Sequence, residues 1–349
     1  MLVQPTGWLV AAGLALATTL SAERDLALAP DPEITVVQDQ ARRTLTAVYG
    51  PVDVPAGVGY EGELVTISAE FELPVDGWLR SFELALTGAD GTRVREPILH
   101  HAGLFSPGKR DLFSPAMERI VAFGQETEAI ALPGQLGYRI QPGDTILLLG
   151  ALYNTTATGY ESLELRLDMV YADARRDVVH TDVLPLYLDV MPPGNRVYEI
   201  PPGRSSRSLE WSPAIDGRIL ALGGHLHQYG TALVLEDVTA GDTIWVGTAS
   251  HDENDELLGV SRKIYLRGER MRADHVYRIT AIYDNPTDEP IGGAMGKIGG
   301  VFLPDRGEEM PPVDRMSEEY LRDWHAMAEH EHELEHVRAA EQSSRGGVR

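Results

Sequence analysis

Four of the eleven histidines lie in two compact pairs whose spacing could bind a metal ion. His225 and His227 are separated by one residue in a strand-like segment, and residues i and i+2 of a strand lie on the same face. Both imidazoles could therefore bind one Cu, Zn or Fe ion. His100 and His101 are adjacent, so they can share an ion only at a β-bulge or a strand edge. The alternative for each pair is a polar pair at a strand end that binds nothing.

A methionine in a glycine-rich segment adds a sulfur donor. Met295 lies between Gly293 and Gly296, in a loop expected between two strands, where a methionine that only fills the core is not expected. Thioether sulfur favours Cu(I) and imidazole tolerates Cu(II), so this donor set could cycle between both states. The chain has no cysteine, which excludes disulfides and thiolate metal sites.

Further histidines occur in the C-terminal segment. The pattern from Met316 to Glu341 predicts a helix that carries His325, Glu329, His332 and His336 on one face. Histidines at i and i+4 of a helix can bind a transition metal. Exposed helices rich in His and Glu usually bind none, so we expect no site here.

The elements that must position these side chains are strands. In Val65–Leu73 and Leu163–Tyr171 apolar residues alternate with others, as in half-buried strands, and turn signals recur at short intervals. This pattern predicts an all-β fold of two tandem sandwiches with a C-terminal helix. The two Pro-Pro-Gly segments, 192–194 and 201–203, predict the crossing between them. The expected parts are a signal segment (1–22), a leader (23–45), two sandwiches (46–192 and 193–304) and an acidic, His-containing helical tail (305–349).

Charge and the first residues bear on location and partners. The chain has 349 residues and a formal net charge of −23, which disfavours nucleic acid as a partner. Residues 1–22 carry no charged side chain, and their short apolar run predicts a cleaved export signal, with an uncleaved anchor as the alternative. We expect no stable membrane insertion beyond this segment and a periplasmic or extracellular protein.

Taken together, these features resemble the copper type II, ascorbate-dependent monooxygenases, the family of peptidylglycine α-hydroxylating monooxygenase and dopamine β-monooxygenase. The resemblance covers about residues 60–303. The matching features occur in the same order as in that family: His100-His101, Ala122–Gly124, Leu132-Pro133, Gly137–Arg139, the Pro-Pro-Gly crossing, His225-x-His227 and Met295. It implies two jelly-roll sandwiches, each with one copper ion, that face each other across a solvent cleft. The absence of cysteine implies a distant, bacterial-type branch.

The resemblance also implies roles for individual residues. His225, His227 and Met295 match the ligands of the catalytic copper. His100 and His101 match two ligands of the electron-transfer copper, but Leu152 occupies the position of its third histidine. His180 and His275 are substitutes by residue type only.

Two further positions of the family pattern differ. Gly223 replaces the arginine that holds a substrate carboxylate, and Lys297 and Gly299 occupy the polar and tyrosine positions after the methionine. A glycine-extended peptide is therefore not the expected substrate.

The expected function is a copper-dependent monooxygenase that hydroxylates a C–H bond with O2 and an external, ascorbate-like reductant. It would use one or two copper ions, and its partners would be a small-molecule substrate or an electron donor. The alternative is a non-catalytic exported copper-binding protein that retains the His225, His227 and Met295 site but lost turnover with Leu152. A third hypothesis is a metal-free double sandwich that binds carbohydrate or protein.

Overall fold

The alternating segments form strands, and their apolar side chains build the core. In β10 (Tyr160–Asp173), Leu163, Leu165, Leu167, Met169 and Tyr171 are all buried, as the pattern predicts. The computed structural model describes residues 33–57, 64–94, 98–124, 127, 129–154, 156–177, 180–194, 197–252 and 257–328. The predicted signal segment and the tail residues Glu329, His332 and His336 lie outside this part of the chain.

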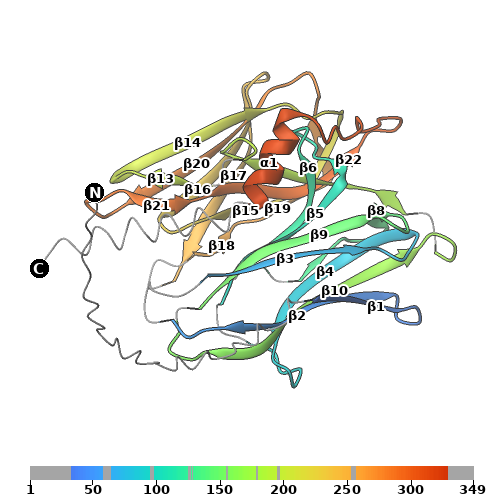
Figure 1. The fold of residues 1–349 in the computed structure, drawn as a ribbon. Coiled ribbons are helices and arrows are strands. Elements are labelled where there is room, and N and C mark those ends of the chain that lie inside the picture. Colours follow the sequence, from blue (N-terminus) through green and yellow to red (C-terminus); the bar gives the residue numbers. More distant parts are fainter. Residues whose placement is uncertain are drawn as a thin grey trace, which may run out of the picture. The chain divides into compact units, whose positions relative to one another are not determined.

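The first sandwich consists of two sheets (Figure 1). One has the order β1 (Glu33–Asp39), β2 (Thr44–Val54), β10, β4 (Gly77–Thr87), β8 (Leu136–Ile140) and β11 (Thr181–Asp182), with β7 (Ile130–Ala131) also on β4. The other has the order β3 (Leu64–Glu72), β9 (Thr145–Tyr153), β5 (Leu99–Arg110) and β6 (Met117–Gly124). Their facing side chains form one apolar core between Leu45 and Tyr171.

The second sandwich has a core of its own. One sheet has the order β12 (Leu184–Asp189), β22 (Gly296–Pro304), β15 (Gly217–Leu226) and β19 (Lys263–Met271). The other has the order β14 (Gly203–Trp211), β20 (Tyr277–Asn285), β16 (Gly230–Asp237), β17 (Asp242–His251) and β18 (Leu257–Val260), and β13 (Tyr198–Ile200) pairs with β21 (Ile291–Ala294). Leu112 and Phe113, from the β5–β6 connection, pack into this second core.

The two sandwiches share a strand order and a turn. The order β3-β9-β5-β6 matches β14-β20-β16-β17, and β2-β10-β4-β8 matches β12-β22-β15-β19. After β9, the Asn154 amide donates to two backbone carbonyls, and its carbonyl oxygen accepts from the N–H and hydroxyl of Thr156. After β20, Asn285 and Thr287 make the same bonds. The fold is thus all-β, with two tandem jelly-roll sandwiches.

The structure corrects two predicted boundaries. β12 pairs with β22, so the second sandwich begins at Leu184 rather than at residue 193. The expected leader also contains β1, which pairs along its whole length with β2. Because β1 is an edge strand whose side chains are at most half-buried, its sequence carries only a weak apolar signal.

The predicted C-terminal helix is present as α1 (Glu318–Ala328), and it packs on the first sandwich. Tyr320 is buried in a small cluster with Phe105, Met117 and Leu147. Asp323 is fully buried and accepts a hydrogen bond of 2.9 Å from Arg119 on β6. Within the described residues, no helix has the length and apolar character needed to cross a membrane.

Candidate metal centre and adjoining cavity

The two histidine pairs of the sequence lie next to each other. The ring centroids of His100 and His101 are 4.7 Å apart, and those of His225 and His227 are 5.0 Å apart. The two pairs meet through His100 and His227, whose centroids are separated by 5.9 Å. The resemblance implies two copper sites that face each other across a cleft, but in this structure the pairs form one cluster of four imidazoles.

A β-bulge brings the adjacent pair together. Along β5, Leu99 pairs with Leu152 and His101 pairs with Ala151, so His100 is the extra residue of the bulge. A bulge was one of the two conditions under which these adjacent histidines could bind the same ion, and the structure contains it. On β9, Gly150 allows the strands this close approach, because a Cβ at that position would lie 2.5 Å from the backbone oxygen of His101.

The other pair sits where β15 ends. His225 is the penultimate residue of β15, and His227 follows the strand directly. The neighbouring position on β22 is Lys297, and the next one on β12 is Asp189. The Lys297 ammonium lies 3.9 Å from the Asp189 carboxylate. The charge nearest to the histidines is therefore partly balanced by an acidic side chain.

Burial holds two of the imidazoles in the neutral form. It lowers the pKa of His100, and the neighbouring His225 and Lys297 lower it further. Burial also holds the pKa of His227 well below its usual value, and His225, His100 and Lys297 add to this, whereas a hydrogen bond with the Gly293 backbone acts in the opposite direction. A neutral imidazole offers the nitrogen lone pair that a metal ion needs.

Met295 lies between β21 and β22, close to where the sequence placed it. The residue is 5% exposed and lines the same cavity as His225. Its backbone oxygen accepts a hydrogen bond from Tyr283, and Tyr283 in turn accepts one from Tyr198 at 2.7 Å. These bonds fix the backbone that carries the thioether.

None of the positions that the sequence suggested supplies a third histidine ligand beside His100 and His101. Leu152 is 1% exposed and belongs to the apolar core of the first sandwich. His180 stacks on Trp78, and the His275 ring lies 2.7 Å from Asp237. The aromatic side chain of β9 beside His100 is Tyr153, at 6.3 Å between centroids. The sequence did not single out this tyrosine.

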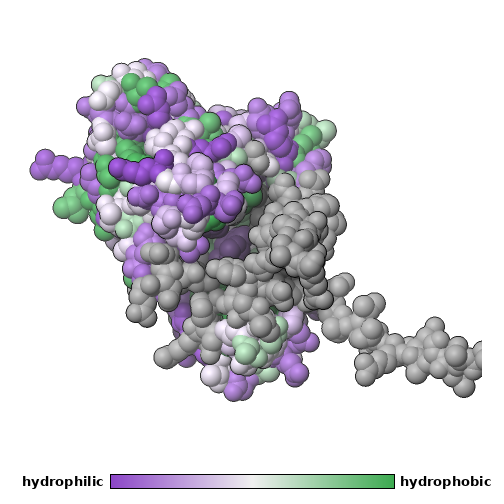
Figure 2. Space-filling model, turned by 90° about the vertical axis from the view of Figure 1, so that its left-hand side faces the viewer, coloured by the Kyte–Doolittle hydropathy of each residue, from purple (hydrophilic) through white to green (hydrophobic). Residues whose placement is uncertain are grey.

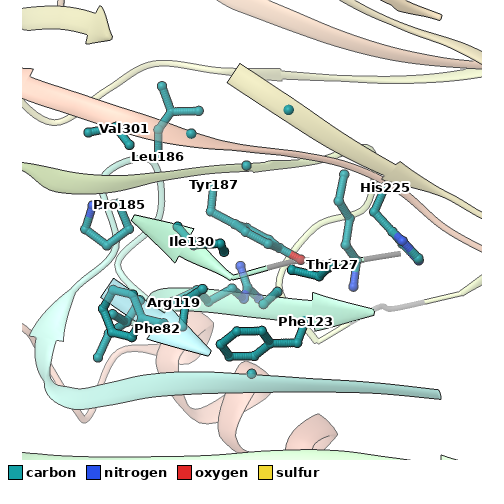
Figure 3. A pocket seen from close by; sticks show the side chains of 18 of the residues that line it. Phe82, Arg119, Phe123, Thr127, Ile130, Pro185, Leu186, Tyr187, His225 and Val301 are labelled. Atoms are coloured by element: carbon teal, nitrogen blue, oxygen red, sulfur yellow. The ribbon is translucent and has the colours of Figure 1, made fainter. Parts of the chain in front are cut away.

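A cavity of about 1100 Å³ adjoins the cluster. His101, His225, Met295 and Lys297 are among its lining residues, and both sandwiches contribute to its walls. In Figure 3, Phe82, Phe123, Ile130 and Leu186 lie around it and His225 lies at one end. The lining is mainly apolar, which suits a small molecule with a hydrocarbon body.

One cation in the cavity wall is held in place from several sides. The Arg119 guanidinium stacks 4.6 Å from the Tyr187 ring (Figure 3). It also donates a hydrogen bond to Asp323 of α1. Its pKa is raised, because the attraction of nearby acidic groups outweighs burial. Sequence reasoning missed Arg119, because its partner Asp323 lies 204 residues away along the chain.

The donor set can be tested against copper by its type and spacing. A metal-bound imidazole nitrogen lies about 2 Å from the ion, so two imidazoles on one ion have centroids roughly 4.5–6 Å apart. The three measured separations fall in this range. Among the described residues, no group of three or more His, Asp or Glu side chains forms a ready metal site. The spacing of His225 and His227 therefore fits two imidazoles on one ion, and the Met295 thioether, which lines the same cavity as His225, is the soft donor available to it.

Comparisons with known proteins identify no family for this chain. No family model and no curated protein matches the chain. Among solved structures, it is similar to the STIV MCP (TM-score 0.39, 10% identity, covering 82% of this chain and 99% of that one). It is also similar to peptide: N-glycanase F (TM-score 0.37, 10% identity, 78% and 98%) and to the major capsid protein P2 from bacteriophage PM2 (0.35, 10%, 76% and 100%). What the site does therefore has to follow from its own residues.

Proposed function

We propose that this chain is an exported copper-dependent monooxygenase that oxidises an apolar small molecule with O2 and an external reductant. The observation that carries the proposal is a cluster of four imidazoles, two of which, His101 and His225, line an apolar cavity of about 1100 Å³. The imidazole cluster or the cavity alone would not support an enzyme, because a metal ligand set needs a substrate pocket beside it to act on a bound molecule.

The metal ligands and the cavity walls have different proposed roles. His225, His227 and Met295 would hold copper, which when bound supplies one-electron redox chemistry and O2 activation. Buried, neutral imidazoles keep their lone pairs available at neutral pH. The apolar walls exclude water and orient the substrate body.

One ion held by His225, His227 and Met295 is favoured over an ion shared by both pairs. Among the described residues, no three His, Asp or Glu side chains form a ready metal site, so His100 and His101 are not added to this ligand set. Electrons would reach this centre singly from the external reductant.

Non-catalytic copper binding is the second candidate, and a specific observation favours it. Leu152 is buried in the core, so a separate electron-transfer site with a third ligand from this position has no support. A protein with this donor set and no turnover would hold Cu(I) and release it to a partner.

Copper titration and O2 uptake together separate these proposals. We expect about one equivalent of copper, with weaker binding in His225→Ala, and O2 consumption by the copper-loaded protein with ascorbate. His325→Ala, an exposed histidine on α1, is the matched control and should change nothing. A protein that binds no copper contradicts both candidates. Copper binding without O2 consumption favours the second, and indifference of binding to His225→Ala contradicts a site built from His225, His227 and Met295.

A further inference from the structure

Two of the most exposed large apolar side chains lie at the opening of the cavity. Leu266 is 98% exposed and Ile264 is 74% exposed, yet both also line the cavity. Residues that do both must lie at its rim. Because they are two positions apart on β19, they share one face of the strand. We refer to Arg262, Ile264, Leu266 and Arg267 as the rim patch.

The rim patch is held in place from behind. β19 is the edge strand of its sheet and pairs with β15. The side chains of Lys263 and Tyr265, which alternate with the apolar pair, both donate to the backbone oxygen of Ile244, at 3.2 and 2.9 Å. This anchoring keeps Ile264 and Leu266 on the opposite, exposed side of the strand.

The charge of the rim patch is opposite to that of the protein. Arg262 and Arg267 lie within six residues of a chain whose net charge is −23, and both are exposed. Within the described part of the chain, no ion pair involves them, whereas Arg270 on the same strand pairs with Asp216 and Asp305. The face shown in Figure 2 is hollowed near its centre, and hydrophilic and hydrophobic side chains mix around the hollow.

We propose that the rim patch docks the protein on an anionic lipid surface, with Leu266 and Ile264 inserted among the acyl chains. Exposed apolar side chains flanked by cations are the combination that binds such a surface, because insertion and charge attraction add. The acidic remainder of the protein is repelled, so only this face can approach. Docking would place the cavity opening against the lipid, from which an apolar molecule enters without crossing water. The proposal does not depend on copper.

The absence of cysteine makes docking directly measurable. In the full chain, Leu266→Cys introduces a single thiol, which is labelled with a polarity-sensitive fluorophore. We expect a blue shift with vesicles of phosphatidylcholine containing about one-third phosphatidylglycerol, and none with phosphatidylcholine alone. The matched control is Val37→Cys, on β1 and 56% exposed, whose label should not shift. A label at residue 266 that does not respond to anionic vesicles overturns the proposal, as does an equal shift at residue 37.

Affinity variants test the two contributions separately. Ile264→Glu with Leu266→Glu, and Arg262→Glu with Arg267→Glu, should each reduce cosedimentation with the anionic vesicles at least tenfold relative to Val37→Glu. Unchanged circular dichroism and thermal midpoints show that the variants fold. Equal binding to neutral vesicles contradicts the role of the cations. Self-association that Leu266→Glu abolishes, without vesicle binding, would assign the patch to a second copy of the chain and overturn the proposal.

Discussion

Glu118 on β6 offers a sharp test of how the first sandwich is built. Its side chain is 4% exposed and accepts a hydrogen bond from Tyr138, a residue of the cavity wall. Burial raises the pKa of Glu118 from 4.5 to about 7, although Lys109 and the Tyr138 hydroxyl act in the opposite direction. The Lys109 ammonium is 3.1 Å from that hydroxyl. Near neutral pH the folded protein therefore carries a proton on Glu118 that the unfolded chain has lost.

The sign and size of the effect follow from linkage. Below pH 4.5 the carboxyl is protonated in both states and its contribution to stability is fully present. As pH rises towards about 7, the unfolded chain releases the proton and the folded protein keeps it, so the free energy of unfolding falls. The difference between the two pKa values corresponds to about 3 kcal/mol.

Urea unfolding of the wild type and of Glu118→Gln, at mildly acidic pH and above pH 7, measures this contribution. The glutamine cannot ionise and retains an acceptor for Tyr138, so the variant should lose about 3 kcal/mol less than the wild type over this range. Titrating groups that do not act on Glu118 contribute equally to both proteins. Glu72→Gln, an exposed carboxyl on β3, should keep the wild-type pH dependence. Parallel pH profiles of Glu118→Gln and the wild type would refute this reasoning.

Three further predictions concern the site and its supports. Leu152→His should destabilise the protein by about 2 kcal/mol, because an imidazole replaces a core side chain, and should leave the copper stoichiometry unchanged; a second bound copper would contradict this. Gly150→Ala should cost about 1–3 kcal/mol in urea unfolding, because its Cβ would lie 2.5 Å from the His101 backbone oxygen. Its control is Gly292→Ala, where a Cβ meets nothing within 4 Å, and equal effects of the two would disprove the role of the close approach. Asp323→Asn should cost about 3 kcal/mol in thermal or urea unfolding, because the Arg119 charge stays buried without its counter-charge, whereas Glu318→Gln on the exposed side of α1 should have little effect; similar losses in both would argue against the buried pair.

Strand periodicity was readable from the sequence because it is local. The alternation in Leu163–Tyr171 predicted a half-buried strand, and all five apolar residues are buried. The spacing of His225 and His227 likewise predicted neighbouring rings, and the structure confirms it. The boundary before β12 was predicted wrongly, because pairing with β22 depends on residues more than 100 positions away.

The meeting of the two histidine pairs could not be predicted, because it depends on long-range packing. His100 and His227 are 127 positions apart, and no local pattern encodes their contact. The bulge at His100 was foreseen only as a condition for ligation, since bulges depend on the partner strand. The Arg119–Asp323 pair and the cavity are non-local for the same reason.

The matching turns after β9 and β20 form within a single sandwich, whereas the imidazole cluster forms between the two sandwiches. Each turn is closed mainly by one asparagine and one threonine of its own sandwich, so either half carries what it needs to end that strand. The imidazole cluster has no such independence, because each sandwich supplies only one of its pairs. The contact between His100 and His227 therefore forms only when both sandwiches are folded and packed together, whereas each turn can close within its own sandwich.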